Sequence, residues 1–146
     1  MSFRLYALNY NGKSEPSDIY TFNVCTVPKG MQSPFKIFSI SNSITLGWKE
    51  PQSNGGCAVI GYAIFRDDSV GGDVIVEVNE DNDTEIRDNS ILRQATISNF
   101  PVDTVGNFFR FKMRVYNREG SSESALVTFL NAGPPDKPSS KVLLLE

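Results

Sequence analysis

The sequence contains no histidine in its 146 residues. Serine and cysteine nucleophiles usually take their general base from histidine, and many metal sites take ligands from it. The absence therefore argues against hydrolases of these types and against most catalytic metal centres. We expect a non-catalytic chain with no catalytic residue, no metal ligand and no cofactor.

Cysteine is scarce, since Cys25 and Cys57 are the only two in the chain. Two are too few for a disulfide-rich scaffold, and no third cysteine or histidine is present to complete a zinc site. Free cysteines behave as small hydrophobic residues and are often buried. We therefore expect two half-buried free thiols, with a Cys25–Cys57 disulfide as the alternative.

Long hydrophobic runs and an excess of basic residues are also missing. No window approaches the roughly 18 apolar residues of a membrane span, and the N-terminal residues lack a signal-peptide pattern. The net charge of -3 argues against nucleic-acid binding. We expect no membrane insertion and no nucleic-acid partner, and the compartment stays open.

An internal repeat links the two ends of the chain. FRLYALNYNGKSE at 3–15 matches FKMRVYNREGSSE at 111–123 with five identities in thirteen positions, against roughly one by chance. After a slip of one residue the match resumes at Thr21, Phe22 and Pro28 against Thr128, Phe129 and Pro135. The period of about 107 residues is the size of one domain.

This repeat predicts a piece of a tandem array. Residues 1–27 would be the last strands of a preceding module, 28–133 a complete module, and 134–146 a linker and the start of a following module. The stretches TVPKGMQSP and AGPPDKPSS support both joints, because proline is poorly tolerated inside a sheet.

Apolar and polar residues alternate in the central part of the chain, as in SITLGW, VIGYAIF and FRFKMRVY. This period of two predicts strands with one face in a core and the other toward water. DVIVEV, ILRQATI and ESALVTFL add further strands, and helical spacing is scarce. We expect an all-β, immunoglobulin-like sandwich of seven antiparallel strands in two sheets. The expected inward residues are Ile44, Leu46, Trp48, Ile60, Tyr62, Ile64, Phe109, Phe111, Met113 and Val115.

The order of motifs in residues 28–133 resembles the fibronectin type III family. SITLGWKEP looks like strand B with Trp48 as its buried indole, and NGGCAVIGYAIFRDD looks like the turn into strand C with Tyr62. ISNFP resembles the segment before the E–F corner, and FFRFKMRVYNREGSSES resembles strand F and the F–G turn. Residues 3–27 resemble strands F and G of a preceding copy. Phe109 departs from the family, which has a tyrosine there.

The resemblance implies a structural, protein-binding module that acts as a spacer and an interaction surface. Neighbouring fibronectin type III modules and unidentified proteins would be its partners, with recognition in the loops 66–73 and 79–90. The alternatives are an accessory module of a larger enzyme or carbohydrate-binding protein, or a repeat of an intracellular or ciliary filament protein.

The acid-rich stretch 78–89 holds the densest group of charged side chains. Asp81, Asp83 and Glu85 alternate there, and calcium prefers oxygen ligands of this kind. Without the glycine and distal glutamate of an EF-hand loop, we expect a solvated loop between strands C′ and E, with calcium binding as the alternative. Asn82 begins an Asn-Asp-Thr glycosylation sequon, which matters only in a secreted chain.

Two other groups have simple structural interpretations. The glycine pairs at 55–56 and 71–72 lack the context of a phosphate-binding loop, and we expect turns with positive φ. Arg110, Lys112 and Arg114 form a basic stripe on one strand face. We expect a solvated face that discourages aggregation, with an acidic partner as the alternative.

The N-terminal segment 1–27 lacks the strands that a sandwich hairpin packs against. Phe3, Leu5 and Ala7 would face inward by their match to 111–115, and Tyr6, Leu8 and Tyr10 lie on the other face. An isolated hairpin is marginally stable in water. We therefore expect it to pack on the central module or to pair with another chain by strand addition.

Overall fold

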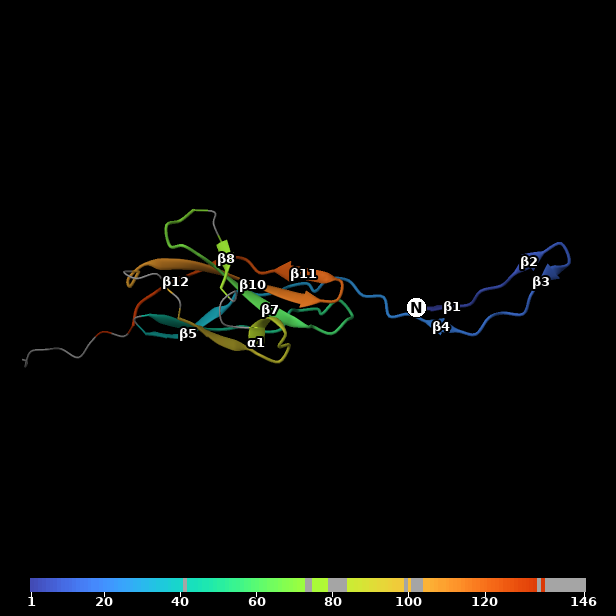
Figure 1. Ribbon diagram of the computed structural model, residues 1–146, viewed down its shortest axis with the longest axis horizontal. Helices are drawn as coiled ribbons and strands as arrows, with labels where there is room; N and C mark the ends of the chain where they lie inside the picture. The colour runs from blue at the N-terminus through green and yellow to red at the C-terminus, as the bar shows by residue number, and fades with distance from the viewer. Residues whose placement is uncertain are drawn as a thin grey trace, which may run out of the picture.

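The computed structural model describes residues 1–40, 42–72, 75–78, 84–98, 100, 104–133 and 135, except for the side chains of Thr84 and Glu85. These residues form a strand sandwich and an extended N-terminal hairpin, which projects from one end of the sandwich (Figure 1). The disulfide-bonded segment between the two parts is described below as the joint.

The sandwich has two antiparallel sheets. The smaller sheet has the order β5-β6-β9, with β5 at Phe35–Ile40, β6 at Ser43–Gly47 and β9 at Gln94–Ile97. The larger sheet has the order β11-β10-β7-β8, and β12 also pairs with β10. Its strands are β7 at Gly61–Asp67, β8 at Ile75–Glu77, β10 at Phe108–Asn117, β11 at Gly120–Glu123 and β12 at Val127–Leu130.

β11 and β12 are two parts of one interrupted edge strand. β11 pairs with the C-terminal half of β10 and β12 with its N-terminal half, while β7 pairs with the opposite edge of β10. With these two parts taken together, the described residues of the sandwich form the expected seven strands in two sheets. The all-β, immunoglobulin-like prediction is confirmed.

The core lies between the two sheets and is rich in aromatic rings. Trp48 and Tyr62 lie 5.7 Å apart between ring centroids, and Trp48 is only 2% exposed. β10 contributes every second residue, because side chains alternate across a strand. The buried inward residues of the predicted set are Ile44, Leu46, Trp48, Tyr62, Ile64, Phe109, Phe111, Met113 and Val115.

Ile60 is the exception among the expected inward residues, with 47% of its surface exposed. It precedes β7, and the neighbouring Val59 packs against the core instead. The alternation therefore does not extend back to position 60, because the regular strand begins only at Gly61.

The outer faces of β6 and β7 are not open to water as the alternation suggested. All five residues of β6 are buried. The Phe35 ring and the Ile37 side chain lie against Gly47. Thr45 and Thr96 share a 2.8 Å hydrogen bond between their hydroxyl groups. Side chains of β5 and β9 thus cover β6 on the outside, and Lys112 and Arg114 of β10 cover Phe65 of β7.

The acid-rich stretch contains a helical turn that the sequence did not predict. The helix α1 spans Thr84–Arg87 and places Ile86, which is 3% exposed, in the core. α1 packs on β7 at Gly61, where a Cβ atom would lie 1.6 Å from the carbonyl oxygen of Arg87. A loop prediction for 78–89 is therefore wrong at this turn. Within the described ranges, no helix is long and apolar enough to cross a membrane.

The N-terminal hairpin is built from two short strand pairs. β1 at Ser2–Phe3 pairs with β4 at Tyr20–Thr21, and β2 at Leu8–Asn9 pairs with β3 at Gly12–Lys13. Its apolar side chains remain in water, with Leu5 73% and Leu8 78% exposed. The expectation that the hairpin packs on the sandwich is wrong, because the hairpin projects away from the end of the sandwich (Figure 1). Its pairing with another chain stays a prediction.

Candidate functional site at the disulfide-bonded joint

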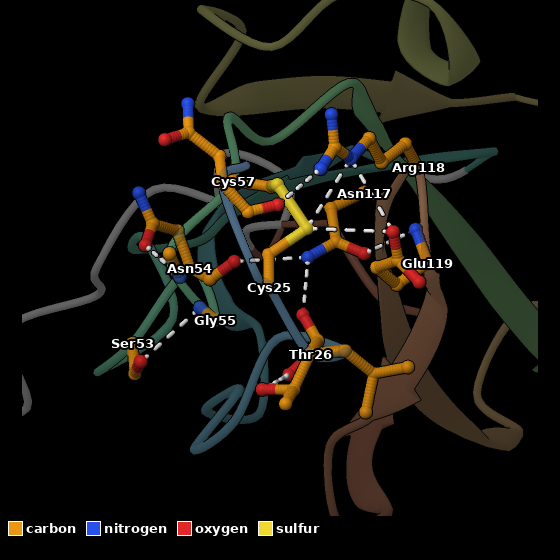
Figure 2. The surroundings of a disulfide bond; sticks show 12 residues. Cys25, Thr26, Ser53, Asn54, Gly55, Cys57, Asn117, Arg118 and Glu119 are labelled. Atoms are coloured by element: carbon orange, nitrogen blue, oxygen red, sulfur yellow. Dashed lines mark hydrogen bonds and ion pairs between the residues drawn. A yellow bond between two sulfur atoms is a disulfide. The ribbon is translucent and has the colours of Figure 1, made fainter. Parts of the chain in front are cut away.

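Cys25 and Cys57 form a disulfide with a Cα–Cα separation of 5.6 Å (Figure 2). The expectation of two free thiols is therefore wrong, and the alternative pairing holds. The bridge ties the segment that leaves the hairpin to the loop before β7, across 32 residues of sequence. Closing a loop of this length restricts the unfolded chain and stabilises the folded state by about 3–4 kcal/mol.

Asn117, at the end of β10, organises the joint from its buried side chain, which is 4% exposed. Its amide nitrogen donates to the carbonyl oxygens of Thr26, at 2.7 Å, and Asn54, at 2.9 Å. Its amide oxygen accepts from the backbone N–H of Glu119 at 2.9 Å. One buried amide thus joins the incoming segment, the loop before β7 and the turn after β10, because all its polar atoms find partners.

The incoming backbone lies tightly against the loop that carries Cys57. The Thr26 N–H donates to the Gly55 carbonyl at 2.9 Å. Gly55 has φ of +74°, and a Cβ there would lie 2.0 Å from the Thr26 oxygen. Glycine is thus required both for the turn and for the close approach. Gly56 and Gly71 share its positive φ as expected, whereas Gly72 does not.

Arg118 lies over the disulfide and reaches the chain that leaves the hairpin (Figure 2). Its Nε atom lies 3.3 Å from Cys25 Sγ and 3.3 Å from Glu119 Oε1, and a terminal nitrogen donates to the Asn23 carbonyl at 2.9 Å. Glu119 Oε1 is also 3.5 Å from Cys25 Sγ. A disulfide sulfur has no proton to donate, so this last contact is not a hydrogen bond.

The charges of the basic stripe on β10 are partly offset within the molecule. Lys112 and Arg114 both pair with Glu123 on β11 and lie over the Phe65 ring. Hydrogen bonding from Lys112 holds the pKa of the Glu123 carboxyl below its usual value. Lys112 and Arg114 are thus paired within the sheet and remain partly exposed, and binding of an acidic partner stays a prediction.

The third basic residue, Arg110, pairs with Asp67 through Nε at 2.7 Å. The Asp67 side chain is 2% exposed, and burial alone would raise its pKa. Hydrogen bonds from the Arg110 side chain and from the Arg110 and Ser69 N–H groups outweigh burial and hold the pKa below its usual value. The carboxylate is thus a structural anchor between β7 and β10.

Other candidate sites from the sequence receive little support or lie elsewhere. Asp81, Asp83, Asn82 and the Glu85 side chain lie outside the described residues. Among the residues that are described, no group of three or more Cys, Asp or Glu side chains could hold a metal ion. An open hollow of about 360 Å³ lies beside the joint, where Glu50 pairs with Arg93.

Comparisons with known proteins agree with this architecture. No protein-family model matches the chain. Human myomesin-2 is 30% identical over 127 residues, which cover 83% of this chain but only 8% of that protein. A crystal structure of titin domains covers 90% of this chain and 40% of its own, with a TM-score of 0.63 and 18% identity.

A second solved structure is matched over nearly its whole length. The fibronectin type III domain of human fibronectin type III domain containing protein 3 covers 81% of this chain and 97% of its own, with a TM-score of 0.55 and 21% identity. The sandwich has the fibronectin type III fold. In the letters of that fold, β5, β6 and β9 are strands A, B and E, β7 and β8 are C and C′, β10 is F, and β11 with β12 is G.

At position 109, where the fibronectin type III family has a tyrosine, this module has a phenylalanine that belongs to an aromatic cluster. Phe109 is fully buried and meets Phe100 edge-on, with ring centroids 4.8 Å apart. The Arg66 guanidinium lies 4.7 Å from the Phe100 ring and 5.4 Å from the Phe109 ring. Ring contacts and a cation thus take the place of a hydroxyl hydrogen bond near the E–F corner.

The sequence marks Asn117 only as part of a turn signature, and it predicts the boundary near residue 27 without the contacts that hold it. The signal was present in the sequence, since Cys25 lies just outside the predicted module and Cys57 just before strand C. A cysteine on each side of a predicted boundary favours a bridge across it, but the closeness of the two segments depends on the chain path. Only the folded structure shows that path.

Proposed function

We propose that this chain is a non-catalytic part of a tandem fibronectin type III array, in which the module at 28–133 spaces its neighbours and binds other proteins. Residues 1–27 would be the F–G hairpin of a preceding module, and 134–146 a linker and the start of a following one. The likeness to segments of myomesin-2 and titin supports a structural role. The observation that carries the proposal is the geometry of the hairpin.

The hairpin reproduces several contacts of the F–G hairpin of the module. Asn9 pairs with Gly12 in the register of Asn117 with Gly120, and the two glycines have φ of +131° and +141°. The side-chain oxygen of Asn9 accepts from the Asn11 N–H at 2.9 Å, as that of Asn117 does from the Glu119 N–H.

The correspondence continues to the far end of the hairpin. Ser17 exchanges hydrogen bonds with the backbone of Leu5, as Ser124 does with that of Met113. The pairs Phe3–Phe22 and Phe111–Phe129 each have ring centroids 6.0 Å apart. The one-residue slip of the repeat falls at Pro16, between matched segments. Such agreement supports a shared structural origin for the two hairpins.

The two copies differ in what covers them. Phe111 and Met113 are fully buried, whereas their counterparts Phe3 and Leu5 are 47% and 73% exposed. In the module, β7 pairs with the edge of β10 that faces away from β11 and β12, and Met113 lies opposite Ile64. We infer that residues 3–9 offer the same edge to a β7-like strand, from a preceding module or from another chain.

A replacement experiment in the parent protein tests the proposal and separates its two parts. Residues 28–133 are either deleted or exchanged for an unrelated sandwich module of equal length with similar distance between its ends. If the module is a spacer, the exchange preserves the parent's assembly and localisation, and deletion does not. If it binds a partner, the exchange also loses that partner. A parent protein that tolerates the deletion would contradict both parts.

A further inference from the structure

We propose that the Cys25–Cys57 disulfide is a thiol-exchange site that sets the stiffness of the joint, and that a small thiol of the glutathione class opens it by attack on Cys57. The chemistry of the bridge stands on the geometry alone, whereas its use in regulating an array rests on the proposed spacer function. Four observations support the site: its position, its access, the placement of Arg118, and the structure of the other joint.

The bridge is the outermost strong restraint on the segment that leaves the hairpin. On the sandwich side, Thr26 is held by Gly55 and Asn117, Lys29 pairs with Ser53, and Pro28 is buried. On the hairpin side, the Arg118 contact to the Asn23 carbonyl is a single hydrogen bond at an exposed position. Breaking the bridge therefore leaves the module folded and frees the chain before Thr26.

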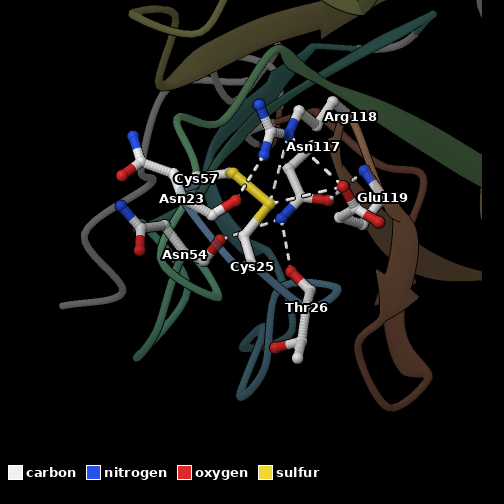
Figure 3. Close-up of polar contacts among 8 residues, drawn as sticks. All are labelled: Asn23, Cys25, Thr26, Asn54, Cys57, Asn117, Arg118 and Glu119. Atoms are coloured by element: carbon white, nitrogen blue, oxygen red, sulfur yellow. Dashed lines mark hydrogen bonds and ion pairs between the residues drawn. A yellow bond between two sulfur atoms is a disulfide. The ribbon is translucent and has the colours of Figure 1, made fainter. Parts of the chain in front are cut away.

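Neither cysteine is enclosed in the module. Cys25 and Cys57 are both only partly buried, and the adjoining residues Val24, Thr26, Gly56 and Ala58 are exposed. The bridge joins the segment that leaves the hairpin to the loop before β7, and neither cysteine belongs to the core between the two sheets (Figure 3). A small thiol can approach it without unfolding the core.

Arg118 makes the two sulfur atoms unequal, because its side chain contacts the sulfur of Cys25 (Figure 3). Its Nε–H group points to Cys25 Sγ at 3.3 Å, so a thiolate that forms on Cys25 gains a charge-assisted hydrogen bond. A lower thiol pKa makes a better leaving group in exchange. The Glu119 carboxylate, 3.5 Å from the same sulfur, opposes this effect and shares the Arg118 cation.

The exchange proceeds in two balanced steps. The attacking thiolate forms a bond to Cys57 Sγ, the disulfide bond breaks, and its electron pair leaves on Cys25 Sγ beside Arg118. A second small thiolate then attacks the sulfur that was added, which releases Cys57 as a thiolate. Two protons reach the protein thiols, two electrons reduce the bridge, and the small thiols leave as their own disulfide.

The boundary at the other end of the module, near residue 133, has no cysteine and therefore no disulfide. In the repeat, Ala132 stands where Cys25 stands, since Pro135 matches Pro28. The backbone there is held by Ser39, which donates to the Ala132 carbonyl, and by exchanged hydrogen bonds between Asn131 and the 106–107 turn. Sensitivity to thiols would therefore distinguish one joint of the array from the next.

The attack site is tested by quenching the purified chain during reaction with glutathione and mapping the mixed disulfide by mass spectrometry. We expect glutathione on Cys57, and a rate about threefold slower in Arg118→Gln, because a less stabilised leaving thiolate departs more slowly. Glu119→Gln should be about twofold faster, since the opposing charge is gone. Glutathione on Cys25, equal rates in the three proteins, or two free thiols in the unreduced denatured chain would each overturn the proposal.

The change in stiffness is tested by residual dipolar couplings of the backbone amides in one alignment medium. In the oxidised chain, couplings of residues 2–22 and of the sandwich should fit one alignment tensor. On reduction, the hairpin couplings should fall to about half while those of the sandwich persist. The Cys25→Ser, Cys57→Ser double variant should behave as reduced protein whether or not reductant is present.

Hairpin couplings that are unchanged by reduction would overturn the proposal that the disulfide sets the stiffness of the joint. The site of thiol attack is tested separately, by the mapping of the mixed disulfide. The replacement experiment in the parent protein remains independent of both. If the exchanged module fails to support the parent while the bridge reacts as described, the spacer function is wrong and the exchange site stands.

Discussion

At the scale of single residues, the stability of this module depends on two buried polar side chains, Asp67 and Asn117, whose polar atoms all form hydrogen bonds. Asp67 and Asn117 each connect two or three segments, and each is less than 5% exposed. Removing one partner of such a group leaves the other desolvated without compensation, which costs more than the net gain of the original hydrogen bond. These two side chains are therefore sensitive positions although neither is part of the hydrophobic core.

The pH dependence of stability follows from Asp67. Its folded pKa lies below the ordinary value of about 4, so its contribution is complete above that pH and is lost as the pH falls through the folded pKa. Glu123 acts in the same direction. We expect the free energy of unfolding in urea to decrease below about pH 4 in the native chain, and to decrease less in Asp67→Asn.

The matched control for this experiment is Asp68→Asn, at an exposed neighbouring position. Its oxygen accepts from the Val70 N–H, and asparagine can keep that bond. At pH 7 we expect Asp67→Asn to lose about 1–3 kcal/mol, and the control to stay within about 0.5 kcal/mol. Equal pH slopes for Asp67→Asn and the native chain would contradict the role of the carboxylate.

Trp48 is the largest fully enclosed side chain of the core. Trp48→Ala should reduce the free energy of unfolding by about 3–5 kcal/mol, because it removes apolar burial and leaves a cavity. Tyr10→Ala is the control, since this aromatic ring is entirely in water. Chemical denaturation measures both, and an unchanged midpoint for Trp48→Ala would show that the indole is not a core residue.

At the scale of secondary structure, α1 and β7 are fitted to each other through the lack of a side chain at Gly61. Gly61 has an ordinary φ, so its role here is space rather than backbone freedom. The turn α1 places Ile86 in the core, and β7 can approach it only where no Cβ intervenes. The helical turn in an otherwise all-β module thus adds Ile86 to the core and packs on β7.

Gly61→Ala should therefore push α1 away from β7 and withdraw Ile86 from the core. We expect a loss of about 1–3 kcal/mol in urea unfolding, as for other overpacked sites. Gly72→Ala is a clean control, because Gly72 also lacks a positive φ and a Cβ there meets no atom within 4 Å. If the two variants unfold at the same urea concentration, the contact between α1 and β7 does not contribute to stability.

At the scale of the whole molecule, two similar hairpins have different surroundings. The hairpin of β10 with β11 and β12 is part of the sandwich, whereas the N-terminal hairpin is exposed. The joint fixes how the unaccompanied copy leaves the module, through a disulfide, a buried amide and a close backbone contact. Because the hairpin buries so little apolar surface, we expect it to add almost nothing to the stability of this chain by itself.

A matched pair of substitutions measures this difference directly. Phe111→Ala should cost about 3–5 kcal/mol in the free energy of unfolding, whereas Phe3→Ala, at the equivalent position of the repeat, should change it by less than about 0.5 kcal/mol. Both are read from the same cooperative transition in urea. A large effect of Phe3→Ala would mean that the hairpin is packed in solution, against the module or another copy.

The sequence by itself determined the class of fold, most of the core and the hairpin repeat. These depend on local periodicity: alternation along FRFKMRVY fixes which face of β10 is inward, and the identities between 3–15 and 111–123 fix the repeat. Alternation was less informative for β6 and β7, because their outer faces are covered by Phe35, Lys112 and Arg114 from other strands.

Only the tertiary structure decided which distant groups meet. The bridge between Cys25 and Cys57, the ion pair of Asp67 with Arg110 and the contact of α1 with Gly61 all join segments far apart in sequence. A sequence pattern records the environment that each residue prefers, but it does not record the path that brings two such residues within bonding distance. That path is set by packing of the whole sandwich, and the joint exists only once the sandwich has formed.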